Sequence, residues 1–243
     1  MRRRAGNLWL AVLLLLTPIC SQAGTYFDES QSLLQQGLET EARRALELEI
    51  AAHPRNLEAR YNLAVLLERI GHRDAAASLY RENLTRGSHL PSVVNLSGLL
   101  RAAGKNNQTR KLLEKATERY RAEAVPWYLL AEMAEQAGNK ASASRYYRKA
   151  IEADDMNGFA HLRYARFLAT NRNLTGAVSE ARRAVELQAE CAPCLKLAGN
   201  IHAQAGNRRE ALALWQRSIA IAPDLQLRDK ILHAMNPPAR ATP

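Results

Sequence analysis

Apolar positions in residues 124–155 recur at the spacing of two consecutive amphipathic helices. The first set precedes Gly138 and has the i, i+3, i+4 pattern of one helical face: Leu130, Ala131, Ala134 and Ala137. The second set follows Asn139: Ala143, Tyr147, Ala150 and Ile151. Glycine tolerates the left-handed backbone that closes a helix. The pattern therefore predicts a helical hairpin that turns at Gly138 and ends near Asp154 and Asp155.

This hairpin pattern is repeated along the chain. Glycines recur at intervals of 34, 33, 34 and 68 residues, at Gly37, Gly71, Gly104, Gly138 and Gly206. Arg172 stands midway through the longest interval. Five residues further on, the positions are Ala42, Ala76, Thr109, Ala143, Ala177 and Ala211. A period of this length indicates that one supersecondary unit was copied and stacked.

Two further columns differ in side-chain size. The expected first helices carry a small residue at one place, namely Ser30, Ala64, Ser97, Ala131, Ala165 and Gly199. The expected second helices carry a larger one, namely Leu46, Tyr80, Leu113, Tyr147 and Trp215, with Ala181 as the exception. Small side chains facing large ones predict close packing of neighbouring helices.

These columns resemble the tetratricopeptide-repeat (TPR) family. The residues that carry the resemblance are Trp127, Leu130, Ala131, Ala143, Tyr147 and Ala150, and in the last full unit Gly199, Ala211, Trp215 and Pro223. The resemblance implies an all-α fold, a right-handed α-solenoid of antiparallel helix pairs, with six repeats over residues 24–224. We expect a capping helix over residues 225–235, because terminal repeats need a polar outer surface, and a disordered tail over residues 236–243.

The resemblance also implies that the first helices line a concave groove that binds a protein or peptide partner. The candidate groove residues are Phe27, Tyr61, Val65, Val94, Tyr128, Leu162 and Arg166. An exposed apolar stripe of this kind marks an interaction surface. The alternative is that these side chains pack between adjacent first helices.

Residues 1–23 have the pattern of a secretory signal peptide. Arg2, Arg3 and Arg4 precede an apolar run over residues 8–16, and small residues before Gly24 suit cleavage there. The run is shorter than the ~20 residues of a membrane span, so we expect no transmembrane segment in the mature chain. The expected location is the bacterial periplasm or cell envelope. A lipoprotein acylated at Cys20 is the alternative.

The chain is basic, with a formal net charge of +10 that falls to about +7 once Arg2, Arg3 and Arg4 are removed. Its basic residues gather in the expected second helices: Arg43, Arg44, Arg110, Lys111, Arg145, Arg148, Lys149, Arg182, Arg183, Arg208 and Arg209. Export argues against nucleic acid as the partner. Two interpretations stay open, a solvated helical face and a patch that attracts anionic lipid, glycan or an acidic protein.

Two cysteines remain after cleavage, Cys191 and Cys194, and an even number in an exported chain predicts a disulfide. Covalent haem attachment needs a histidine where Leu195 stands, and zinc needs further ligands, for which His202 alone is insufficient. We expect a structural disulfide across the turn between two repeats. A thiol–disulfide enzyme, or an accessory to one, is the alternative.

The sequence contains no pattern for a catalytic, metal or phosphate site, and we expect no cofactor. The function that it favours is a non-enzymatic scaffold for protein–protein interaction in pilus, secretion or envelope assembly. The alternatives are the thiol–disulfide function and a glycan- or lipid-binding module that uses the basic face.

Overall fold

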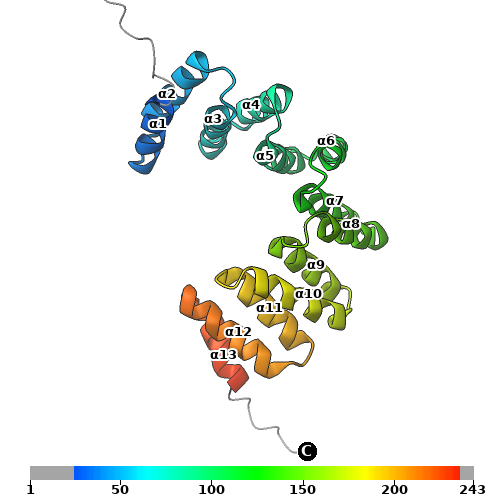
Figure 1. Cartoon of the computed structure of the whole chain (residues 1–243). Coiled ribbons are helices and arrows are strands. Elements are labelled where there is room, and N and C mark those ends of the chain that lie inside the picture. The colour runs from blue at the N-terminus through cyan, green and yellow to red at the C-terminus, as the bar shows by residue number, and fades with distance from the viewer. Residues whose placement is uncertain (1–24, 236–243) are drawn as a thin grey trace, which may run out of the picture. The chain divides into compact units, whose positions relative to one another are not determined.

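The computed structural model describes residues 25–235, and within that range it contains thirteen α-helices and no β-strand (Figure 1). The chain divides into two compact units, the first ending at Gly87 and the second beginning at Ser88. The first unit contains α1 (Thr25–Gln35), α2 (Glu39–Ala52), α3 (Leu57–Arg69) and α4 (Arg73–Arg86). The predicted signal peptide (1–23) and tail (236–243) lie outside the described residues.

The second unit contains the other nine described helices. They are α5 (Leu90–Ala102), α6 (Asn106–Arg119), α7 (Ala124–Gln136), α8 (Lys140–Ala153), α9 (Gly158–Thr170), α10 (Leu174–Leu187), α11 (Ala192–Gln204), α12 (Arg208–Ile221) and α13 (Leu225–Met235). Helices α1 to α12 pair in chain order into six hairpins. The six hairpins are divided between the two compact units. The division falls at Gly87, whose backbone is fully extended (φ −170°, ψ −177°) where α4 ends.

A residue with a left-handed backbone closes the first helix of each of the six hairpins. Five are glycines with φ between 70° and 91°: Gly37, Gly71, Gly104, Gly138 and Gly206. The sixth is Arg172, with φ of 64°. The turns at Gly138 and Arg172 also have the same hydrogen bond. Asn139 N donates to Ala134 O at 2.8 Å, and Asn173 N donates to Leu168 O at 2.9 Å. Both hydrogen bonds belong to the Schellman motif that closes a helix. Arg172 therefore has the same backbone conformation as the glycines at the other turns.

The columns of small and large residues lie buried between the helices. In the last hairpin, a Cβ added at Gly199 would lie 2.4 Å from Cδ1 of Trp215, so the indole packs directly on the glycine. In α8 the fully buried Tyr147 has its ring centroid 5.6 Å from that of Tyr164 and 5.3 Å from that of Phe167. Ala181 packs in the same cluster, but it is an alanine where the equivalent residue of α8 is the aromatic Tyr147.

The end of the second unit is covered by α13. Leu227 and Ile231 of this helix are buried against Ala211 and Trp215 of α12. None of the helices in residues 25–235 combines the length and the apolar character that a membrane span needs. The predicted all-α fold of tandem helix pairs is confirmed.

Candidate binding face of the first helices

The candidate groove residues of the first unit lie on α1 and α3. Phe27 and Tyr61 are half-buried, and the ring of Tyr61 lies 5.8 Å from that of Tyr80. Val65 is 38% exposed and lines a shallow pocket of about 90 Å³ with Gln31 and Arg69. This part of the face is therefore apolar and open, but it contains little enclosed space.

In the second unit, Tyr128 of α7 is a candidate that contacts both the core and a cation. It is half-buried against the core, and the guanidinium of Arg163 from α9 lies 4.7 Å from its ring centroid. Burial raises the pKa of the Tyr128 hydroxyl, and the nearby Arg163 charge opposes that shift. The phenol is neutral, with a cation stacked on it.

Leu162 of α9 differs from the other candidates because it is buried. It packs with Ala184 of α10 and Cys194 of α11 and is 8% exposed. Val94 of α5 is half-buried. In the structure, the predicted apolar stripe is therefore interrupted at α9, where the side chain packs between helices.

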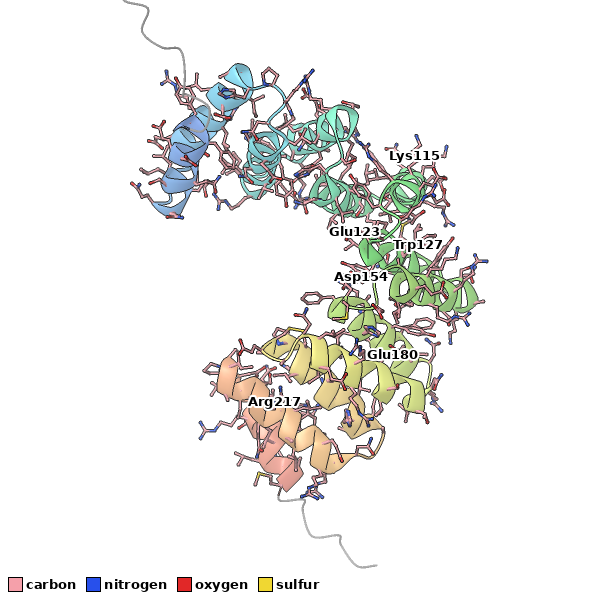
Figure 2. All side chains as sticks on the ribbon, in the orientation of Figure 1. Lys115, Glu123, Trp127, Asp154, Glu180 and Arg217 are labelled. Atoms are coloured by element: carbon pink, nitrogen blue, oxygen red, sulfur yellow. A yellow bond between two sulfur atoms is a disulfide. The ribbon has the colours of Figure 1, made fainter. Side chains whose placement is uncertain are left out.

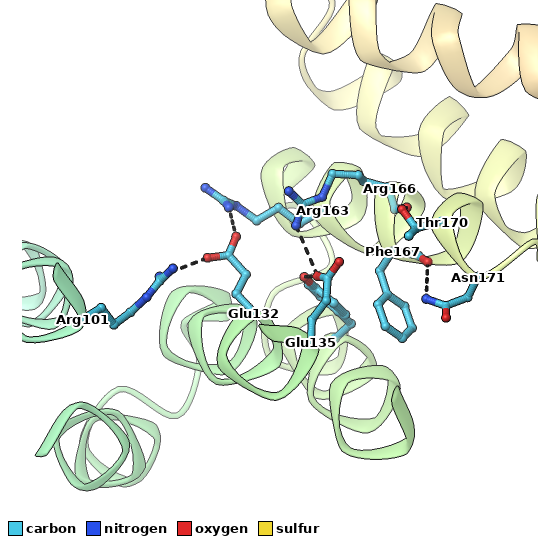
Figure 3. A network of polar contacts seen from close by, with 9 residues as sticks. Arg101, Glu132, Glu135, Arg163, Arg166, Phe167, Thr170 and Asn171 are labelled. Carbon is cyan, nitrogen blue, oxygen red and sulfur yellow. Dashed lines mark hydrogen bonds and ion pairs between the residues drawn. The ribbon is translucent and has the colours of Figure 1, made fainter. Parts of the chain in front are cut away.

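Charged side chains cross the first-helix face from one repeat to the next (Figure 3). Glu132 of α7 contacts Arg101 of α5, with Nη1 and Oε2 3.5 Å apart, and also forms an ion pair with Arg163 of α9. Its carboxylate is 12% exposed, so solvent screens these contacts less than it would at an open surface. Three successive first helices are joined in this way.

A second polar contact lies one turn along the same helices. Oε2 of Glu135 accepts a hydrogen bond from the hydroxyl of Tyr147 at 3.0 Å. It also accepts one from Nη2 of Arg166 at 3.3 Å (Figure 3). Burial and the Glu135 carboxylate raise the pKa of Tyr147 well above its usual range. The neutral hydroxyl and the Arg166 cation thus hold Glu135 between the core and the face. The same tyrosine–glutamate contact occurs in the first unit, where the Tyr80 hydroxyl donates to Glu68 at 3.1 Å.

A hollow of this face lies where α9, α11 and α13 meet. It has a volume of about 480 Å³ and is lined by Arg166, Ala169, Thr170, Leu197, Asn200, Ile201, Ala203, Gln204 and Lys230. The lining contains two cations and no carboxylate. Nζ of Lys230 lies 2.7 Å from Oδ1 of Asn200, and burial, with the neighbouring Lys196, lowers the pKa of Lys230. An acidic group is therefore the complementary ligand for this hollow.

The two cysteines lie at the start of α11. Cys191 is the N-cap residue, its Sγ accepts the N–H of Cys194 at 3.3 Å, and the two sulfur atoms lie at bonding distance, 1.93 Å. Pro193 occupies the first turn between them. The pair joins the N-cap to the first turn of α11 and does not span the turn between repeats, where it is expected from the sequence.

The basic second helices use part of their charge in local contacts. Lys149 of α8 lies 4.6 Å from the ring centroid of Trp127, and Arg145 lies 5.4 Å from that of Tyr146 (Trp127 is labelled in Figure 2). Arg43 pairs with Glu47 at 2.8 Å. Within residues 25–235 no three histidine, cysteine, aspartate or glutamate side chains gather as metal ligands would.

Sequence reasoning missed the residues that cross the first-helix face, namely Arg101, Glu132, Glu135 and Arg163. The signal was present as a spacing, because Arg101–Glu132, Glu132–Arg163 and Glu135–Arg166 are each 31 residues apart. That interval is one repeat less about one helical turn. At this interval, opposite charges on adjacent first helices are in contact.

Comparisons with known proteins agree with this architecture. Family models described as "Tetratricopeptide repeat" match residues 27–91 and 124–155. A chain of the APC/C hetero-tetramer Cut9–Hcn1 is similar in structure, with 16% identity and a TM-score of 0.64 over 88% of this chain and 42% of that one, so this chain spans less than half of it. The pilF protein of Pseudomonas aeruginosa has 19% identity and a TM-score of 0.61 over 85% of this chain and 95% of its own.

A tetratricopeptide repeat protein from Parabacteroides merdae gives 16% identity and a TM-score of 0.60 over 86% and 85% of the two chains. At these identities the similarity shows the fold alone. No curated protein sequence matches the chain.

Proposed function

Because the chain belongs to the tetratricopeptide-repeat proteins, we propose that it binds a partner peptide on its first-helix face. Proteins of this family are generally non-enzymatic scaffolds for protein–protein interaction. An acidic group of the peptide would lie in the hollow between α9, α11 and α13. The observation that carries the proposal is the lining of that hollow. Arg166 and Lys230 supply positive charge, Asn200 and Gln204 supply amides, and Leu197 and Ile201 supply apolar surface.

The acidic group can be an Asp or Glu side chain or a terminal carboxylate, since all three present the same acceptor oxygens. Arg166 already holds Glu135, but a guanidinium has five N–H donors and can serve a second carboxylate. Tyr128 and Val94 would then contact the rest of the peptide along α7 and α5. Tyrosine and arginine are enriched among the hot spots of interfaces, where truncation to alanine costs ~2 kcal/mol or more of the binding free energy.

A selection from a random peptide library tests this proposal. We expect the purified protein to enrich peptides that contain an acidic residue or need a free C-terminus. The double variant Arg166→Gln, Lys230→Gln should lose that enrichment. Arg228→Gln is the matched control, because it removes one positive charge from an exposed position of α13 that does not line the hollow. The proposal is wrong if the double variant selects the same peptides as the wild type.

Tyr128 provides a second test, independent of the acidic group. Tyr128→Ala should weaken binding of the selected peptide about tenfold or more, with little change in stability relative to Tyr147→Ala. Equal unfolding of the two variants would assign Tyr128 to the core and remove it from the binding face. If charge reversal at Arg145 and Arg148 abolished binding, the basic second helices would be the site instead.

We further propose that the scaffold works in the bacterial periplasm or cell envelope, in pilus, secretion or outer-membrane assembly. The support for this location is the sequence pattern of residues 1–23. N-terminal sequencing of the mature protein should find Gly24 first, and a lipidated Cys20 or a retained Met1 would contradict that. Capture from envelope extracts with the wild type and the double variant would identify the partner and hence the assembly.

A further inference from the structure

A second pocket lies away from the proposed peptide site, between the second helices α10 and α12. It has a volume of about 470 Å³. Its lining comes from α10 and the residues just after it, from α12, and from His202 of α11: Ala181, Arg182, Val185, Glu186, Ala189, His202, Glu210, Ala213, Leu214 and Arg217. Arg217, at the edge, is labelled in Figure 2. The volume lies within the range of small-molecule sites, ~300–1,000 Å³.

The pocket exists because small side chains line both helices. Ala181, Ala189 and Ala213 contribute one methyl group each, and Val185 and Leu214 supply the larger apolar surfaces. The counterparts of Ala181 in α8 and α12 are Tyr147 and Trp215, which are buried rings. Ala181 is itself fully buried and therefore forms the inner end of the pocket.

His202 supplies a polar atom without a partner. The residue is 6% exposed, and its Nδ1 is buried and forms no hydrogen bond within the described part of the chain. Burial lowers the pKa of His202, so the imidazole is neutral at neutral pH. The two other buried histidines of this unit have partners. His161 has both ring nitrogens bonded, to Glu180 at 2.7 Å and to Asp155 O at 3.0 Å, and Nδ1 of His89 lies 2.8 Å from Oγ of Ser92. Buried polar atoms are rarely left unpaired in proteins, and those that are need an explanation.

Charged groups surround the mouth of the pocket. Arg217 donates to Ala189 O at 3.1 Å, and Glu186 pairs with Arg183 at 3.3 Å. Arg182 and Glu210 act on His202 through their charges, but neither has an ion-pair partner among residues 25–235. The guanidinium of Arg182 is therefore available to stack on a ring, as Arg163 stacks on Tyr128 and Lys230 on Trp215 elsewhere in this unit.

We infer that this pocket binds a small phenolic ligand, with its ring between α10 and α12 and its hydroxyl on Nδ1 of His202. A phenol combines a flat apolar body with a group that both donates and accepts, so it satisfies Nδ1 in either tautomer of the neutral imidazole. An apolar hydrocarbon would leave Nδ1 unpaired, and an aliphatic alcohol would offer the arginines no ring to stack on. The inference does not depend on the proposed peptide site, because the two pockets share no lining residue.

The probe for this inference is p-cresol. The control ligand is toluene, which has a similar shape but no hydroxyl group. In a titration followed by NMR, p-cresol should shift the imidazole ¹⁵N signals of His202 and leave those of His161 in place. Toluene should bind at least about tenfold more weakly, because it leaves Nδ1 without a partner. Equal binding of the two probes, or p-cresol binding without a change at His202, would overturn the inference.

Two variants locate the site. Ala213→Phe adds bulk at an exposed lining position of α12 and should abolish p-cresol binding, whereas Ala220→Phe makes the same change at an exposed position of α12 outside the pocket and should not. The variant His202→Leu should bind toluene and p-cresol with equal affinity. Should that buried variant fail to fold, the pair of exposed α12 variants still decides, and unchanged binding by Ala213→Phe excludes this pocket.

Discussion

The repeat formed by α7 and α8 and the repeat formed by α9 and α10 share a backbone and differ at three matched places. Tyr147 fills the core of the first, whereas Ala181 stands at that position in the second. Gly138 closes α7 and Arg172 closes α9. Trp127 and Tyr146 form a ring pair with centroids 6.2 Å apart, and His161 and Glu180 replace them with a polar pair at 2.7 Å. The hairpin geometry therefore tolerates different side-chain chemistry at matched positions.

Tyr147 should give the largest effect. Tyr147→Ala removes a fully buried ring that contacts Tyr164 and Phe167, and we expect a loss of ~3–5 kcal/mol in the free energy of unfolding. Tyr147→Phe keeps the ring, removes the bond to Glu135 and should lose about 1 kcal/mol. Denaturant unfolding measures both. If Tyr147→Ala cost less than 1 kcal/mol, the α7–α8 repeat would not depend on its ring and the contrast with Ala181 would lose its meaning.

The polar pair should make the stability of the second unit depend on pH. Burial alone would lower the pKa of His161, but the bonds to Glu180 and to Asp155 O outweigh it, with Arg183 opposing, and the pKa is raised. The folded protein therefore prefers the protonated ring. The stabilisation is complete below the ordinary histidine pKa of ~6.5 and is lost as the pH rises through the higher folded value.

His161→Gln should consequently cost about 1.5–3 kcal/mol at mildly acidic pH, the contribution of a hydrogen bond between charged groups, and less as the pH rises. Unfolding free energies measured across this range test the trend. His233→Gln, at an exposed position of α13, is the control and should show neither effect. A difference that grew with pH would have the wrong sign and would refute the assigned pairing.

The turn residues should give the smallest effect. The left-handed backbone at Arg172 costs an L-residue roughly 1–2 kcal/mol. Glycine avoids that cost, but its greater freedom in the unfolded chain costs ~0.5–1 kcal/mol on folding. Arg172→Gly should therefore raise the stability by up to ~1 kcal/mol, and Gly138→Arg should lower it by a similar amount. Thermal melts of the two variants check the signs. Loss of stability in Arg172→Gly would show that the arginine side chain contributes a contact of its own.

Most of the fold follows from local patterns in the sequence, and the exceptions have physical causes. The glycine period predicted the positions of the turns. It also predicted the turn at Arg172, because the hydrogen bonds that close a helix are made by the backbone and not by the side chain. The size columns located buried positions such as Gly199 and Trp215. The repeat columns do not indicate the division after Gly87, because they mark positions within each hairpin and not the contacts between hairpins.

The site was less predictable than the fold. Tyr128 and Arg166 lie on the face that the repeat columns indicate, but the burial of Leu162 depends on Ala184 and Cys194, which belong to other helices. The exception at Ala181 was visible in the sequence, yet nothing local shows that His202 lies beside it. Such contacts are set by how α10, α11 and α12 pack together.

The contacts of Glu132 with two neighbouring repeats bear on the number of copies in this array. Arg101 contacts a residue 31 positions downstream, and in the intact chain that residue is Glu132. An in-frame deletion of residues 124–157 would remove one repeat and bring Arg166 to the position of Glu132, opposite Arg101. Two cations would then face each other where a carboxylate stood. Recombination between repeats can shorten such genes without disturbing the helical pattern, and here the charges disfavour the shorter product.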